Sequence, residues 1–142
     1  MKLDDFLKFT KDLGLNKIEL RNDLPGGKII DGYTPGQLKE LSKKYGVEIL
    51  TINALQKFNL AAILPETIQE LKKLINLSLS IGCKAIVLCP NNDVNDKRNS
   101  EEIFKETVKA LTQLHHNPPK YSKNTLLRRH KPLQDKEIRI QI

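Results

Sequence analysis

The chain has no tryptophan, one methionine and two cysteines, and aromatic residues make up only 5% of its 142 residues. No window holds the roughly 18 apolar residues that a membrane span needs, and the N-terminus lacks the apolar region of a signal peptide. The two cysteines, Cys83 and Cys89, lie in or next to one apolar run. Without a histidine nearby they make a poor metal site. We interpret them as reduced, partly buried thiols of a cytoplasmic protein.

Positive charge is in excess, with a formal net charge of +7, which first suggests an anionic partner such as nucleic acid. The excess is unevenly distributed. Residues 1–114 hold 17 basic and 15 acidic side chains, whereas residues 115–142 hold 7 and 2. All three histidines lie in the second segment (His115, His116 and His130). We therefore predict a folded domain over 1–114 and a basic tail over 115–142, either disordered or translated out of frame.

The tail leaves one alternative function open. A small, basic α/β binding module whose tail binds nucleic acid would also explain the positive charge. We rank this alternative lower, because no aromatic platform for stacking bases accompanies the basic residues. Binding that weakens steeply with salt would favour it.

Three segments of the chain resemble one another, and each opens with a glycine followed by an apolar, β-branched run. They are "GLNKIELR" from Gly14, "GVEILTIN" from Gly46 and "GCKAIVLCP" from Gly82. Each glycine follows apolar residues spaced by three and four, which predicts an amphipathic helix ended by a left-handed glycine. Helix and strand thus alternate, and this order implies parallel strands joined by crossover helices.

Helix starts are also marked. Thr34 followed by proline is typical of an N-cap and first turn. Asn99 or Ser100, followed by two glutamates, predicts the start of a fourth helix that extends to Leu114.

Alternation along the strands assigns their side chains to two faces. The face that we expect to point inward carries Glu19, Arg21, Ile49, Thr51 and Asn53, and the other carries Ile18, Leu20, Leu50 and Ile52. Polar groups that face inward at the carboxyl ends of parallel strands are what an active site in a barrel needs. An open sheet is usually covered by helices on both faces and would have to bury these charges. The pattern favours a barrel.

The loops that follow the strands are longer than the turns that precede them, and they are rich in Asn, Asp, Gly and Lys. Loops at the carboxyl ends of parallel strands build binding sites. Their composition suits a small, polyhydroxylated ligand, although the same residues also dominate ordinary solvated turns.

The segments "IELRNDLPGG", "LTINALQKFN" and "AIVLCPNND" occur in this order at the expected ends of consecutive strands. They resemble the sugar-phosphate isomerase/epimerase superfamily, which is built on the xylose isomerase-like TIM barrel, and are most similar to inosose (2-keto-myo-inositol) isomerases of inositol catabolism. The resemblance covers about residues 3–114. It implies a partial (β/α)8 barrel of about three parallel strands with covering helices, corresponding to the second, third and fourth strands.

The resemblance implies a reaction as well. In the intact family a divalent metal ion (Mn, Co or Zn), held by Glu, Asp, His and Glu, polarises a carbonyl and the adjacent hydroxyl of a sugar or cyclitol. A carboxylate then moves the proton on the carbon between them. Those ligands belong to later strands, so we expect this chain to bind no metal and to be inactive alone.

Five residues are candidate substrate contacts: Glu19, Arg21, Asn53, Phe58 and Asn59. By the resemblance, Arg21 would hydrogen-bond substrate oxygens or a neighbouring carboxylate. Asn53 would bind a hydroxyl, and Phe58 would close over an apolar ring face. The alternatives are structural: Glu19 and Arg21 as an internal ion pair, and Phe58 as part of the core.

The first barrel strand and the later half are expected to be missing. Only Met1 and Lys2 precede the first predicted helix, and after Leu114 the sequence turns to "HHNPP", which cannot continue a helix. Such a fragment exposes two strand edges and an inward face unless another chain covers them. We expect self-association or pairing with a complementary barrel half.

Overall fold

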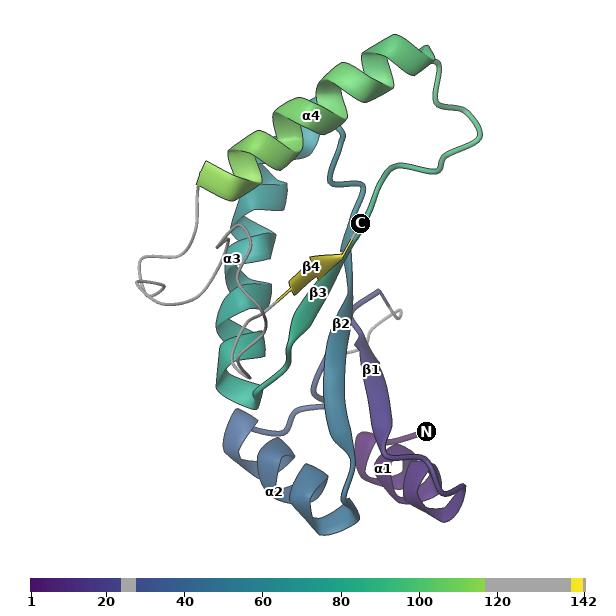
Figure 1. The fold of residues 1–142 in the computed structure, drawn as a ribbon, viewed down its shortest axis with the longest axis vertical. Helices are drawn as coiled ribbons and strands as arrows, with labels where there is room; N and C mark the ends of the chain where they lie inside the picture. The colour runs from purple at the N-terminus through teal and green to yellow at the C-terminus, as the bar shows by residue number, and fades with distance from the viewer. Residues whose placement is uncertain (24–27, 117–138, 142) are drawn as a thin grey trace, which may run out of the picture.

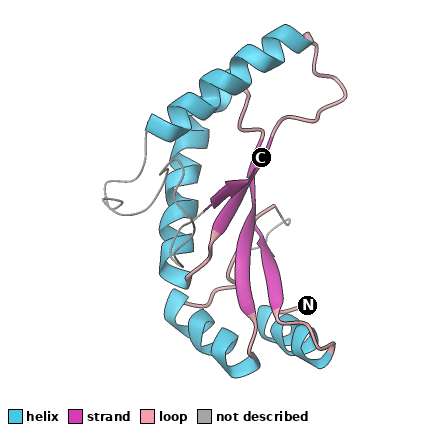
Figure 2. Cartoon of the chain, in the orientation of Figure 1, coloured by secondary structure: helices cyan, strands magenta, loops and turns pink. Residues whose placement is uncertain are grey.

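The computed structural model describes residues 1–23 and 28–116, and the backbone of residues 139–141. Helices and strands alternate throughout these residues (Figure 2). In chain order the elements are α1 (Leu3–Asp12), β1 (Lys17–Arg21), α2 (Pro35–Tyr45), β2 (Glu48–Gln56), the short 3-10 helix η1 (Ala61–Ile63), α3 (Leu64–Ile81), β3 (Ala85–Cys89), α4 (Ser100–His116) and β4 (Arg139–Gln141). Within the described ranges, no helix is both long and apolar enough to span a membrane.

The predicted helix starts are built as capping boxes. At the start of α2 the hydroxyl of Thr34 accepts a hydrogen bond from the backbone N–H of Gln37, whose side chain accepts one from the backbone N–H of Thr34. Asn99 and Glu102 make the same reciprocal pair at the start of α4, at 2.9 and 2.8 Å. Each box satisfies two backbone donors that the first helical turn leaves unpaired.

Helices α2 and α3 end at glycines, as predicted, whereas α4 ends later than predicted. Gly46 and Gly82 adopt the left-handed conformation, with φ of 66° and 78°, which costs little without a Cβ. Helix α4 continues two residues past Leu114, to His116. A proline restricts the residue that immediately precedes it, and His116 lies two positions before Pro118, outside that restriction.

The strands form one sheet in the order β1-β2-β3-β4, and each neighbouring pair is parallel. Parallel pairing of the first three strands was predicted from the repeat and is confirmed. The short strand β4 adds a fourth member at the β3 edge. It lies within the predicted tail, most of which falls outside the described residues, so the boundary between domain and tail and the state of the tail stay predictions.

The pairing of β1 with β2 contains a bulge that the sequence pattern did not indicate. Ile18 lies beside Ile49, but Glu19 lies beside Thr51, so the register shifts by one residue at Leu50. The prediction that Ile49 shares the inward face with Thr51 is therefore wrong, because Ile49 is buried in the core together with Ile18. An extra residue in one strand reverses the faces that alternation assigns beyond it.

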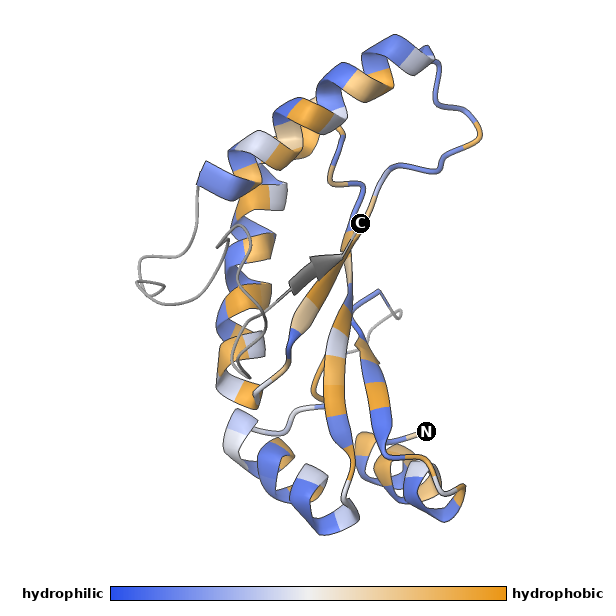
Figure 3. Ribbon diagram, in the orientation of Figure 1, coloured by the Kyte–Doolittle hydropathy of each residue, from blue (hydrophilic) through white to orange (hydrophobic). Residues whose placement is uncertain are grey.

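The hydrophobic core lies between the sheet and the helices. Helix α3 packs against β2 and β3, α2 packs against β2, and the outer helices α1 and α4 pack against α2 and α3 (Figure 1). Strand β1 supplies every second side chain to this core, which appears as alternating polar and apolar bands along the strand (Figure 3). The large core-facing strand residues are Ile18, Leu20, Ile49, Ile52, Leu55, Ile86 and Leu88.

Candidate functional site

The face of the sheet opposite the core carries polar side chains of β1 and β2. On β1 the burial alternates, so that Ile18 and Leu20 are buried while Glu19 and Arg21 are exposed. The register places Arg21 beside Asn53 of β2. The predicted inward face thus exists for β1 and for the second half of β2, with Ile49 as its one correction. We call the set Glu19, Arg21, Thr51 and Asn53 the inner face.

Glu19 joins two strands through its carboxylate. It accepts hydrogen bonds from the hydroxyl of Thr51 and, at 2.8 Å, from the side-chain amide of Asn53. The predicted alternative of an internal ion pair between Glu19 and Arg21 is not what forms. A carboxylate has about four acceptor sites, so Glu19 can still accept hydrogen bonds from the hydroxyls of a ligand.

Arg21 forms its ion pair with Asp23 instead, two residues further along the chain. Its Nε and Nη2 atoms lie 2.7 and 2.6 Å from the two carboxylate oxygens of Asp23. This hydrogen bond raises the pKa of Arg21 and lowers the pKa of Asp23, so both groups are charged. The guanidinium has five donors and the Arg21 side chain is half exposed. It can therefore donate to ligand oxygens while it remains paired.

Asn22 links the end of β1 to β2 and α3 by hydrogen bonds. Sequence analysis did not predict this role. Its backbone N–H donates to the carbonyl of Asn53 at 2.8 Å, and its side-chain oxygen accepts from the backbone N–H of Ala54 at 3.2 Å. Its side-chain amide also donates to Glu70 of α3 at 3.2 Å. The carboxyl ends of β1 and β2 are thereby held together beside the inner face.

Phe58 and Asn59 lie away from solvent, just past the end of β2. Phe58 is completely buried in the hydrophobic core, which favours the structural alternative over a cover for a ligand. Asn59 is 1% exposed, donates to the hydroxyl of Thr107 at 3.0 Å and accepts from the backbone N–H of Asn91 at 2.7 Å. Both residues hold the loops in place, and a substrate contact by either stays a prediction.

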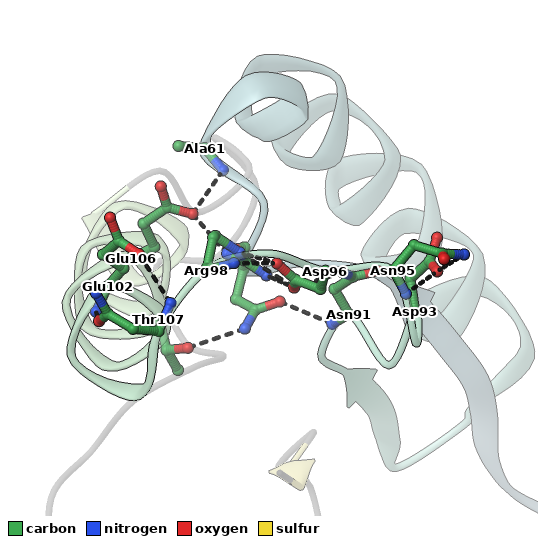
Figure 4. Close-up of polar contacts among 11 residues, drawn as sticks. Ala61, Asn91, Asp93, Asn95, Asp96, Arg98, Glu102, Glu106 and Thr107 are labelled. Carbon is green, nitrogen blue, oxygen red and sulfur yellow. Dashed lines mark hydrogen bonds and ion pairs between the residues drawn. The ribbon is translucent and has the colours of Figure 1, made fainter.

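The loop after β3 is held by an arginine that sequence analysis also missed (Figure 4). Arg98 lies 2.6 Å from Asp96 and 2.6 Å from Glu106 of α4, and it donates to the backbone carbonyl of Asn59 at 2.8 Å. Asn91 donates to the same aspartate at 2.7 Å. These contacts raise the pKa of Arg98 and lower the pKa of Asp96. We call these five residues the Arg98 cluster.

The Arg98 cluster connects the loop after β2, the loop after β3 and the first turns of α4. An aspartate two residues before an arginine was the available signal in "NDKRN", but that spacing is common in ordinary turns. The partners on Asn59 and Glu106 are distant in sequence and follow only from the fold. The cluster fixes the loops that border the inner face.

A metal site does not form from the described residues, in which no group of three His, Cys, Asp or Glu side chains lies close enough to hold an ion. His115 and His116 stack edge to face at the end of α4, whereas His130 lies outside the described part of the chain. The residues present thus do not fit the four-ligand site that the resemblance implies for the intact family.

The ion pair of Asp96 makes stability depend on pH. Because hydrogen bonds from Arg98 and Asn91 hold the pKa of Asp96 below its ordinary value, the folded state binds fewer protons than the unfolded state in mild acid. This contribution is complete above about pH 5 and is lost progressively as the pH falls below about 4. We expect Asp96→Asn to be less stable than the wild type near neutrality. The difference, measured by urea denaturation, should narrow near pH 3.

Glu101→Gln is the matched control, since it removes an exposed ion pair with Lys105 on the same helix. Exposed pairs contribute little, so this variant should follow the wild type at every pH. A gap between Asp96→Asn and the wild type that stays constant from neutral to acid pH would contradict the pairing of Asp96.

Comparison with known proteins places this geometry in a family. Residues 7–117 match the family described as xylose isomerase-like TIM barrel. A xylose isomerase domain-containing protein from Salmonella typhimurium LT2 is 35% identical, with a TM-score of 0.68 over 82% of this chain. The IolI protein with a bound zinc atom is 28% identical, with a TM-score of 0.69 over 80%. D-psicose 3-epimerase from Clostridium cellulolyticum H10, at 14% identity and a TM-score of 0.62 over 80%, shares the fold.

The chain spans about two fifths of the length of these solved structures, at 40%, 41% and 42% of the three chains. A comparison with curated proteins gave no match. The predicted fold, part of a TIM barrel with parallel strands and covering helices, is confirmed by the structural likeness. The chain therefore belongs to the xylose isomerase-like TIM barrel family.

Proposed function

We propose that this chain supplies part of the substrate-binding surface of a sugar or inosose isomerase/epimerase, an enzyme that moves a proton on the carbon next to a carbonyl. Two findings support the proposal: the chain belongs to the xylose isomerase-like family, and its inner face lies at the carboxyl ends of parallel strands, where barrel enzymes bind their substrates. The observation that carries it is the fixed carboxylate of Glu19 with Asn53 and Arg21 beside it.

Each of these groups suits a polyhydroxylated ligand. Glu19 accepts hydrogen bonds from hydroxyls, and its own hydrogen bonds from Thr51 and Asn53 keep it oriented. Arg21 donates to carbonyl or hydroxyl oxygens and adds a positive charge close to them. Asn53 presents both a donor and an acceptor. The set binds and orients a sugar or cyclitol.

The metal chemistry of the intact family is not assigned to these residues. A divalent ion there acts as a Lewis acid, but the described residues offer no cluster able to hold one. Any ligand set must come from residues outside those described here or from another chain. We therefore propose that the described part of the chain binds substrate without completing the reaction.

The direct test is turnover. We expect the purified chain to convert no inosose, with or without added Mn²⁺ or Co²⁺, when the product is followed by chromatography. Turnover that depends on the added metal would overturn the proposal that this chain is inactive alone.

Binding is the complementary test, because it distinguishes an incomplete site from no site. Titration with an inosose should shift the side-chain amide signals of Asn53 and the Nε signal of Arg21 in ¹⁵N nuclear magnetic resonance spectra. The side-chain amide of Gln37 lies at the start of α2 and serves as an internal control. Equal shifts at all three, or none at millimolar ligand, would count against a substrate-binding inner face.

A further inference from the structure

The described elements amount to half of a complete barrel. Four helices alternate with four strands in the order α1-β1-α2-β2-α3-β3-α4-β4, and all four strands are parallel. A closed barrel of this family's fold has eight strands, each with its helix. Two sets of four units therefore equal one barrel.

Both edges of the sheet are open within the part of the chain that the structure describes. In the strand order β1-β2-β3-β4, β1 pairs only with β2 and β4 pairs only with β3 (Figure 1). Each open edge presents a row of backbone N–H and C=O groups that a further strand can bind. A barrel is the arrangement that leaves no such edge.

Exposed apolar residues gather on the helices at the two ends of this array. Phe9 on α1 is 51% exposed, and Phe104 on α4 is 68% exposed. Of the nine large apolar side chains that are exposed in the described residues, six lie on α1, next to it, or on α4. These six are Met1, Phe9, Leu13, Leu15, Phe104 and Val108. The central helices α2 and α3, which have a neighbour on each side, contribute one, Leu79.

We propose that two copies of this chain associate head to tail around a twofold axis along the barrel, so that β1 of each copy pairs with β4 of the other. This rotation keeps all eight strands parallel and closes both edges. It places α1 of one copy next to α4 of the other, which covers the exposed apolar residues at both ends. The inner faces of the two copies then line one shared hollow.

The structure favours a second copy over an unrelated occupant of the open edges. Each copy offers the two unlike ends that the other requires, and the count of four units closes the ring after two copies without remainder. A head-to-tail contact that closes gives a defined oligomer, whereas one that does not close gives filaments. The inference rests on the barrel geometry and not on the proposed isomerase function. A negative result in the turnover assay therefore leaves the dimer untouched, and a monomeric chain leaves the proposed function untouched.

The test is the mass of the full chain in solution. Sedimentation velocity and light scattering, from low to high micromolar concentration, should give a species of twice the 16.2 kDa chain mass. Phe9→Glu and Phe104→Glu each place a charge in the proposed contact, and burying an unpaired charge is costly. Each variant should raise the dissociation constant of the dimer by more than about tenfold. Val94→Glu is the matched control, because Val94 is 95% exposed and lies on neither end helix.

Mixing the two variants tests the head-to-tail arrangement itself. In either variant alone, both contacts of the dimer carry the new charge. In a mixed dimer of Phe9→Glu with Phe104→Glu, one contact carries both charges and the other carries none. The mixture should therefore regain part of the dimer that each variant lacks.

Three results would overturn the inference: a wild-type chain that is monomeric throughout the range, a wild type that forms open-ended assemblies, or a mixture as monomeric as its components. Circular dichroism checks that the variants fold, which is expected for substitutions at exposed positions. If a variant does not fold, the mass of the wild type still decides between dimer and monomer.

Discussion

Replacing Phe58 by alanine is expected to lower the free energy of unfolding by about 3–5 kcal/mol, the range for a large aromatic side chain removed from a core. Phe58 is completely buried, and its backbone N–H donates to the carbonyl of Cys89, so the ring is fixed where β2 and β3 end. Alanine would leave a cavity that these two strands cannot readily fill. Urea denaturation followed by circular dichroism measures the loss.

Two further variants make the Phe58 prediction specific. Phe58→Leu keeps most of the volume and should cost less than about 1.5 kcal/mol. Val94→Ala alters an exposed side chain in the loop after β3 and should leave stability unchanged within about 0.5 kcal/mol. If Phe58→Ala were as stable as the wild type but bound an inosose more weakly, the ring would be a cover for the ligand and its assignment to the core would be wrong.

Replacing Arg98 by alanine is expected to lower the free energy of unfolding by about 2–4 kcal/mol. This is the second of the two large effects. Its side chain is 17% exposed, forms ion pairs with Asp96 and Glu106, and donates a hydrogen bond to the carbonyl of Asn59. Removing it takes a charged donor away from two carboxylates and a donor away from a carbonyl, and the loss of a hydrogen bond by a partly buried acceptor is costly. The loss appears as a lower urea midpoint with an unchanged dependence on denaturant.

Arg21 provides the matched control for Arg98. It also binds an aspartate two residues away through two nitrogen atoms, but its side chain is 52% exposed. Water replaces an exposed ion pair readily, so Arg21→Ala should change stability little. Arg98→Lys keeps the charge but loses the planar guanidinium with its several donors. Its stability should lie between those of Arg98→Ala and the wild type. Equal losses for Arg21→Ala and Arg98→Ala would show that the Arg98 cluster does not fix the loops.

The fold was largely predictable because its signals are local. The helix at 35–45 is marked by the Thr34 cap and by Gly46, and both features act within a few residues of the chain. The parallel order follows from the alternation of helix and strand. The bulge beside Ile49 was not predictable, since it arises from the fit between β1 and β2 and leaves no mark in either strand alone.

The candidate site was predictable only in part, for the same reason. Glu19 and Asn53 alternate with apolar residues, so their shared face could be inferred from their own strands. An ion pair between Arg21 and Glu19 was one of two alternatives that the sequence left open, and Arg21 instead binds Asp23, two residues further along the chain. The role of Arg98 depends on its contacts with Asn59 and Glu106. These residues come close to Arg98 only when the loops fold, so their spacing in the sequence does not indicate the contacts.

The measurement that tests the central claim most directly is the pattern of nuclear Overhauser contacts between backbone protons of neighbouring strands. Parallel strands in the stated register predict contacts that join Leu20 to Ile52, and Asn53 to Val87, in one sheet. The side chain of Glu19 should contact those of Thr51 and Asn53. Antiparallel contacts between these strands, or contacts from Glu19 to the core-facing side of α3, would contradict the account.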